Sequence, residues 1–105
     1  MAFAHPSKPF TQAQVEAINP SHSGVYGLLR ADAWIYIGRG NIRERLLGHL
    51  HGDHEGITQE RPTHWTAEVT PNQVNREREL VIELYPICNQ EVEIPFRVPQ
   101  KVAQG

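Results

Sequence analysis

The stretch GVYGLLRADAWIYIGRGNIRERLLGH, residues 24–49, decides the fold expected for this chain. It opens with two apolar and aromatic runs, residues 24–30 and 34–38, which are typical of two short strands joined by a tight hairpin. From Asn41, a residue that caps helices well, the apolar residues recur at helical spacing instead. The pattern therefore predicts a hairpin that runs directly into a helix over about residues 41–51.

Four polar side chains in this stretch are expected to face one region. Tyr26 and Tyr36 lie ten residues apart on adjacent strands, and an antiparallel hairpin can bring such residues together on one face. Arg45 and His49 are four residues apart, so they share one face of the following helix. Taken singly, each is an ordinary strand or helix surface residue. Together they place two phenols, a guanidinium and an imidazole near one another.

The remaining elements complete a small α+β fold. Residues 64–69 alternate in polarity and predict a third strand, and a cap followed by a first-turn proline predicts a helix over 71–85. We expect a mainly antiparallel three-stranded sheet flanked by helices, within a domain that covers residues 24–89. The tail, residues 90–105, offers a possible edge strand at 92–96 and is otherwise expected to be disordered.

The first 23 residues predict an arm outside that domain. Pro6 and Pro9 remove backbone donors and disfavour helix in the residues before them, so residues 1–10 read as irregular. Residues 11–18 predict a short helix that must dock on the domain, because eight residues are marginal alone.

Length, composition and charge limit the class of protein. A chain of 105 residues with a single cysteine, Cys88, fits one domain without intramolecular disulfides in a reducing compartment. No run is long and apolar enough for a signal peptide or a membrane span, so we expect a soluble, cytoplasmic protein without a membrane partner. The net charge of −2 argues against a general nucleic-acid coat protein. A local basic cleft is still possible, because four arginines lie close together in the sequence: Arg30, Arg39, Arg43 and Arg45.

A histidine-containing segment follows the first helix. Residues 51–62 lack periodicity and predict a loop, and loops of that length in small domains are often functional. His49, His51, His54 and His64 suggest zinc, but their spacing matches no specific metal motif and no second cysteine is present. We interpret them as exposed loop histidines. The helix over 71–85 carries three carboxylates that could join the tyrosines and the arginine, and periodicity alone does not choose among Glu77, Glu79 and Glu83.

The ordered set of these motifs resembles the GIY-YIG nuclease family. The matching segments are GVY at 24–26, YIG at 36–38, NIRER at 41–45 and ERELVIELYPICN at 77–89. Each motif alone is weak, whereas their order and spacing over most of the chain are much more specific. The resemblance implies six site residues, namely Tyr26, Tyr36, Arg45, His49, Glu77 and Asn89.

Within this resemblance, sequence spacing selects the site arginine and the site glutamate from neighbouring residues of the same kind. Arg45 is favoured over Arg43 because it alone lies one turn from His49. Glu77 is favoured over the other helix carboxylates because it precedes Asn89 by the family's twelve-residue interval.

The resemblance also implies the chemistry. Glu77, with waters, would hold one Mg²⁺ or Mn²⁺. A single carboxylate with several waters suits Mg²⁺, because this cation dehydrates reluctantly. Arg45 would contact the scissile phosphate with its planar fork. Tyr26 would act as general base, with Tyr36 orienting the water or the phosphate and His49 assisting proton transfer. Further phosphate contacts are expected from two neighbouring arginines, Arg39 and Arg43.

Two functions are compatible with this reading. The first is a metal-dependent endonuclease that hydrolyses DNA with little sequence preference, since no base-reading element is present and phosphate contacts carry no sequence information. A protein partner or the shape of the substrate would then supply specificity. The alternative is a non-catalytic module that keeps the fold and binds nucleic acid or protein. Glu77 opposite Arg45 favours the enzyme, because a carboxylate facing phosphate without a metal would repel it.

Overall fold

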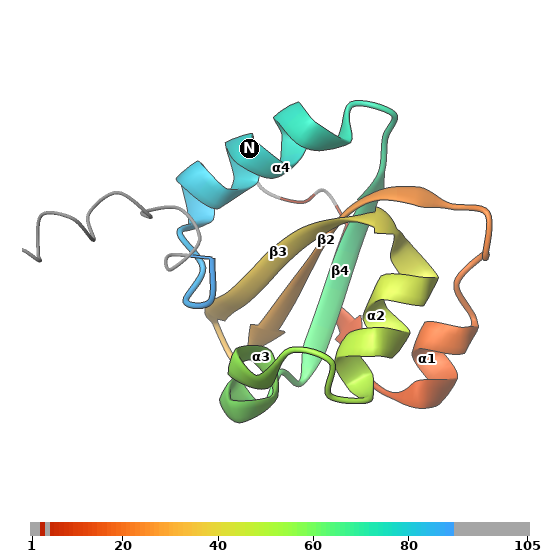
Figure 1. Ribbon diagram of the computed structural model, residues 1–105, viewed down its shortest axis with the longest axis vertical. Helices are drawn as coiled ribbons and strands as arrows, with labels where there is room; N and C mark the ends of the chain where they lie inside the picture. The colour runs from red at the N-terminus through yellow and green to blue at the C-terminus, as the bar shows by residue number, and fades with distance from the viewer. Residues whose placement is uncertain (1–2, 4, 90–105) are drawn as a thin grey trace, which may run out of the picture.

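The computed structural model describes residue 3 and residues 5–89, and its fold is α+β (Figure 1). A four-stranded antiparallel sheet is flanked by helices. The elements in chain order are β1 (Lys8–Pro9), α1 (Gln12–Glu16), β2 (Ser23–Arg30), β3 (Ala33–Asn41), α2 (Ile42–Leu50), α3 (Glu55–Glu60), β4 (His64–Val69) and α4 (Gln73–Leu84). Within this part of the chain, no helix combines the length and apolar character needed to span a bilayer.

The strand order is β1-β4-β2-β3, so β2 lies in the interior of the sheet between β3 and β4. In the β2–β3 hairpin Tyr26 pairs with Gly38, and Leu28 pairs with Tyr36. A close approach between β2 and β4 requires a glycine, because a Cβ atom on Gly24 would overlap the backbone of Glu68. The predicted strands over 24–30, 34–38 and 64–69 are confirmed.

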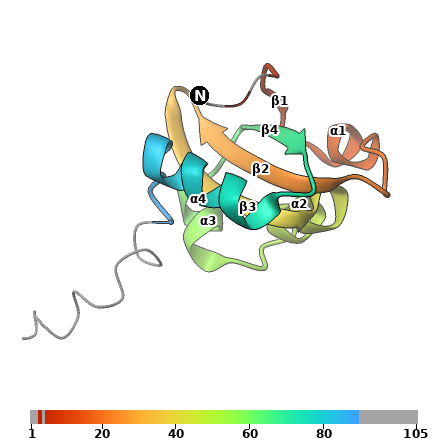
Figure 2. The ribbon, with the colours of Figure 1, turned by 90° about the horizontal axis from the view of Figure 1, so that it is seen from above.

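Helices cover both faces of the sheet, as Figures 1 and 2 show. Tyr26 and Leu28 point to the face that carries α1, α2 and α3, where they join a buried cluster with Leu46. Val25 and Ile37 point to the other face and pack against α4. Because side chains alternate along a strand, this arrangement gives the sheet two apolar cores and buries residues 24–28 of β2.

The predicted three-stranded sheet is wrong, because a fourth strand comes from the arm. Lys8 and Pro9 in β1 pair with Trp65 and His64 of β4, in a segment expected to be irregular. A proline is tolerated there because β1 is an edge strand and needs few backbone donors. The ladder continues at Phe10, whose N–H donates to the Thr63 carbonyl at 2.9 Å.

The predicted loop over residues 51–62 is also wrong in part, because it contains α3. The His54 ring caps this helix by accepting a hydrogen bond from the Ile57 N–H at 3.3 Å, and the fully buried Ile57 anchors it. Arg61 ends it in a left-handed conformation, with φ of 55°. A single apolar residue in one and a half turns gives no helical period, which explains the error. The expected edge strand over 92–96 lies outside the described residues.

Helices α1 and α2 begin at the predicted caps, whereas α4 begins after Asn72, two residues beyond the predicted start, and has no side-chain cap. The Thr11 hydroxyl accepts a hydrogen bond from Gln14, and the Asn41 side chain accepts one from the Glu44 N–H at 2.9 Å. These bonds satisfy donors that the first helical turn leaves unpaired. The Asn41 cap ends β3 and begins α2 at the same residue, so the hairpin fixes the position of α2 directly.

Candidate active site

The register of the hairpin brings the two tyrosines together. The ring centroids of Tyr26 and Tyr36 lie 6.3 Å apart. Gly38, the cross-strand partner of Tyr26, provides the space between them, since a Cβ atom at Gly38 would overlap the phenol of Tyr26. Tyr26 is fully buried, whereas Tyr36 is partly exposed.

His49 reaches the tyrosines from α2. Its Nε2 lies 2.7 Å from the Tyr26 hydroxyl, and its ring meets the edge of Tyr36 at a centroid distance of 5.4 Å. The imidazole is only 5 % exposed. Burial lowers its pKa, and the opposing carboxylate of Asp53 raises it in part.

Asp53 is a member of this cluster that sequence reasoning missed. Its Oδ1 lies 2.9 Å from Nδ1 of His49, on the side of the ring opposite Tyr26. The available signals were the four-residue spacing from His49 and the adjacent Gly52, whose φ of 88° reverses the chain after α2. Neither signal identifies a contact without the three-dimensional turn.

Arg45, and not Arg43, joins the tyrosines. A hydrogen bond with Tyr26 raises the pKa of Arg45, and the side chain is otherwise exposed. Arg43 turns toward α1, where its Nε donates to the Glu16 carbonyl at 3.4 Å. The two arginines of NIRER therefore have different surroundings, and of the two only Arg45 interacts with a tyrosine of the cluster.

Burial sets the proton affinity of both phenols. It raises the pKa of Tyr26 well above 10, more than the nearby Arg45 guanidinium lowers it. The pKa of Tyr36 is raised by burial and, next in size, by the charge of Glu77. Neither phenol therefore ionises readily in the protein alone.

Glu77 comes from α4, on the other side of the sheet, and approaches the site at the β3 edge. Its Oε1 accepts a hydrogen bond from Nε of Arg39 at 3.0 Å, and its side chain is 26 % exposed. Its negative charge is, after burial, a cause that raises the pKa of Tyr36. Among residues 5–89 no group of three or more histidine, cysteine or acidic side chains is arranged to hold a metal ion. One partly exposed carboxylate fits a cation that keeps most of its water ligands.

Asn89 supports the site strand from outside the cluster. Its Oδ1 accepts a hydrogen bond from the Ile37 N–H at 2.7 Å, and its Nδ2 donates to the Ile37 carbonyl at 2.9 Å. Ile37 lies between Tyr36 and Gly38, so the asparagine holds the strand that carries the second phenol. Its amide is used by this contact, which gives Asn89 a structural position and no direct contact with the phenols.

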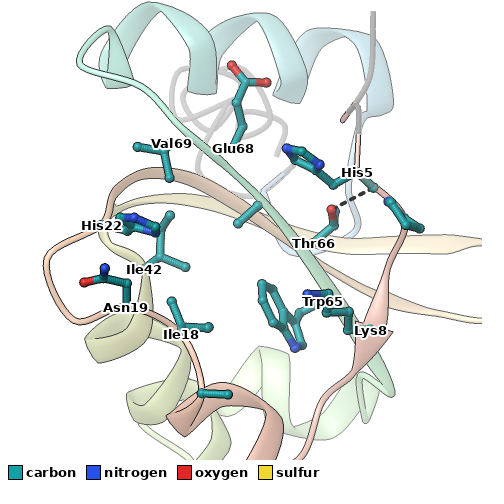
Figure 3. A pocket seen from close by; sticks show the side chains of 13 residues that line it. His5, Lys8, Ile18, Asn19, His22, Ile42, Trp65, Thr66, Glu68 and Val69 are labelled. Atoms are coloured by element: carbon teal, nitrogen blue, oxygen red, sulfur yellow. Dashed lines mark hydrogen bonds between the residues drawn. The ribbon is translucent and has the colours of Figure 1, made fainter.

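The tyrosine cluster lies apart from a cavity beside β4. This cavity, of about 570 Å³, lies between the segment that follows α1, the N-terminal segment and β4. Figure 3 shows Ile18 and His22 on one side of it and Trp65 and Lys8 on the other. The candidate site instead lies beside the exposed Arg45, and Arg39 lines a separate hollow of about 340 Å³ at the start of α4.

Comparisons of the chain with protein-family models, with curated proteins and with solved structures find no match. The functional interpretation therefore depends on the residues and the geometry of this cluster.

Proposed function

We propose that the chain is a metal-dependent endonuclease that hydrolyses phosphodiester bonds in DNA, with the site organisation of the GIY-YIG nuclease family. One observation carries this proposal. Two phenols, one of them hydrogen-bonded to a buried imidazole, interact with an exposed guanidinium, and the charge of the Glu77 carboxylate acts on the second phenol. Phosphodiester hydrolysis needs a proton acceptor for water, a cationic donor to phosphate and a ligand for a divalent ion.

Arg45 binds the scissile phosphate in this proposal. Its exposed guanidinium can form two parallel hydrogen bonds to phosphate oxygens. In the protein alone its interaction with the fully buried Tyr26 raises the pKa of Arg45. A phosphate that engages Arg45 draws the guanidinium off the phenol, and the Tyr26 hydroxyl then becomes open to the attacking water. Tyr36, which is partly exposed beside it, orients that water or the phosphate.

Glu77 holds one Mg²⁺ or Mn²⁺, with water completing the coordination. When bound, such an ion neutralises charge that develops on the phosphate during cleavage. Arg39, which pairs with Glu77 in the protein alone, then becomes available to a neighbouring phosphate. Arg43 is engaged with α1, so we assign it a minor role in phosphate binding.

All of these contacts are to phosphate or to water. Phosphate contacts position a nucleic acid without reading its sequence, so cleavage has little intrinsic sequence preference. A protein partner or a feature of DNA structure supplies specificity. The buried thiol of Cys88 is compatible with a reducing compartment, and we place the protein in the cytoplasm.

A non-catalytic binding module is the second candidate. The observation that favours it is that both arginines already interact within the protein, Arg45 with Tyr26 and Arg39 with Glu77. In such a module these two interactions would stabilise the fold and would persist when a ligand binds.

Replacement of Tyr26 by phenylalanine tests the enzyme directly. Incubation of the full chain with supercoiled plasmid DNA and Mg²⁺ should give nicked circles, and chelation of the ion should stop the reaction. Tyr26→Phe keeps the ring and removes the hydroxyl, so cleavage should fall by roughly 100-fold or more, as expected for loss of acid–base catalysis. Tyr85→Phe, at an exposed tyrosine after α4, is the matched control. Equal cleavage by Tyr26→Phe and Tyr85→Phe would remove Tyr26 from the reaction.

A further inference from the structure

Asp53 is held against His49 by a tight turn at Gly52, whose φ of 88° side-chain-bearing residues rarely adopt. After α2 the chain reverses at Gly52, and the Asp53 N–H donates to the Gly48 carbonyl at 3.1 Å. This turn aims the carboxylate at Nδ1 of His49, 2.9 Å away. Gly48 provides the space, because a Cβ atom there would lie 2.6 Å from Oδ2 of Asp53.

The contact with Asp53 fixes where His49 carries its hydrogen. An ionised carboxylate only accepts hydrogen bonds, so Nδ1 of His49 donates to Asp53. The neutral imidazole then has its lone pair on Nε2, which lies 2.7 Å from the Tyr26 hydroxyl. Tyr26 must therefore donate to His49. The hydrogen bonds from Tyr26 to His49 and from His49 to Asp53 run in one direction.

We propose that Asp53 is a positioning residue that keeps His49 ready as the final proton acceptor in phosphodiester cleavage, with Tyr26 relaying the proton. This inference rests on the proposed nuclease function. As the water oxygen bonds to phosphorus, one water proton passes to the Tyr26 oxygen while the Tyr26 proton passes to Nε2 of His49. The bond from phosphorus to the leaving oxygen breaks, and the departing alkoxide takes its electron pair and a proton from solvent. The His49 imidazolium later releases its proton to solvent.

The relay is consistent with the burial of Tyr26. Burial raises the pKa of this phenol, so a lasting phenolate would be unfavourable. In the relay Tyr26 loses one proton as it gains another and stays neutral. The positive charge develops on His49, where the Asp53 carboxylate stabilises it.

The pH dependence of cleavage distinguishes the relay from a phenolate base. Burial lowers the pKa of His49 below its ordinary value of 6.5, and only the neutral imidazole can accept a proton. The rate should therefore rise with pH as His49 loses its proton and then level off. A Tyr26 phenolate would instead give a rate that still rises beyond pH 9. The groups that face His49 are Tyr26 on β2, Tyr36 on β3, Arg45 on α2, and Asp53 and His54 after α2.

Asp53→Asn removes the carboxylate with little change in size. In the full chain with plasmid DNA and Mg²⁺, we expect kcat to fall by about 10- to 100-fold, a part of what acid–base catalysis contributes, with KM nearly constant. The rising limb of the pH profile should move to lower pH, because the charge that raises the pKa of His49 is gone. Glu55→Gln removes an exposed carboxylate two residues away and should change neither quantity.

Gly48→Ala is a second variant that leaves Asp53 in the sequence. Its methyl group displaces the carboxylate from His49, so kcat should fall as in Asp53→Asn while the thermal midpoint is not lowered. A parental kcat and pH limb in both variants would overturn the role of Asp53.

Nitrogen NMR of the His49 ring tests the positioning without any cleavage. The parent should show the tautomer with hydrogen on Nδ1, and Asp53→Asn should lose this preference. Hydrogen on Nε2 in the parent would overturn the inference whether or not the protein cleaves. A parent with the Nδ1 tautomer but no cleavage of any DNA or RNA would refute the nuclease function and leave the Asp53 contact with His49 established.

Discussion

At the scale of single residues, the ion pair between Arg39 and Glu77 controls access to the proposed metal ligand. The guanidinium and the carboxylate are 3.0 Å apart, with side chains 48 % and 26 % exposed. Partly exposed pairs of this kind contribute at most about 1 kcal/mol, so a divalent ion can replace Arg39 at modest cost. The pair therefore acts as a weak competitor for the metal.

Arg39→Gln should make that competition visible. Without the guanidinium, the Mg²⁺ concentration that gives half-maximal cleavage should fall, by up to about fivefold for a pair of about 1 kcal/mol. Affinity for DNA should weaken, because one phosphate contact is lost. Titration of cleavage against Mg²⁺ and of binding against fluorescent DNA measures the two effects separately. Arg78→Gln, at an exposed position on α4, is the control, and a higher Mg²⁺ requirement in Arg39→Gln would contradict the competition.

At the scale of elements, β3 is stabilised by the Asn89 side chain, whose amide forms the hydrogen bonds that the backbone of a neighbouring strand would form. The segment after α4 runs along β3, with the Ile87 and Cys88 N–H groups donating to the Trp34 and Ile35 carbonyls. The Asn89 amide then pairs with both backbone groups of Ile37. The strand that carries Tyr36 is thus supported on the edge opposite β2.

Asn89→Ala should weaken this support. It leaves the buried N–H and carbonyl of Ile37 without their partner, which costs about 1–3 kcal/mol of the free energy of unfolding. Urea unfolding followed by circular dichroism measures the loss. Asn75→Ala, at an exposed position on α4, should change stability by less than about 0.5 kcal/mol. Equal stability of the two variants would mean that solvent replaces Asn89 at the strand.

Elements with strong local signals were predictable from the sequence, and those fixed by tertiary contacts were not. The cap at Asn41 and the ten-residue spacing of Tyr26 and Tyr36 predicted the centre of the fold, because strand register and helix period are local properties. Strand β1 and helix α3 depend on partners far along the chain, namely Trp65 for Lys8 and the buried core for Ile57. The contact of Asp53 with His49 was likewise not predictable from the sequence, because it depends on the geometry of the turn after α2.

At the scale of the whole molecule, the candidate site is assembled from both sides of the sheet. His49 and Arg45 come from α2 on one face, and Glu77 comes from α4, which packs on the other. Glu77 contacts the sheet through Arg39 of β3, the strand at the edge of the sheet that also carries Tyr36. In the proposed nuclease, Glu77 and Arg45 would therefore act on the same phosphate from helices on opposite faces of the sheet.

Cleavage of supercoiled plasmid DNA by Glu77→Gln is the measurement that tests this nuclease assignment most directly. The substitution keeps size and helix propensity and removes the charge proposed to hold the ion, so Mg²⁺-dependent cleavage should collapse by roughly 100-fold or more while the fold and DNA binding persist. Glu79→Gln removes a carboxylate two residues away that pairs with Arg76, and it should stay near parental activity. Normal cleavage by Glu77→Gln, or a parent that never cleaves DNA or RNA with Mg²⁺ or Mn²⁺, would contradict the assignment.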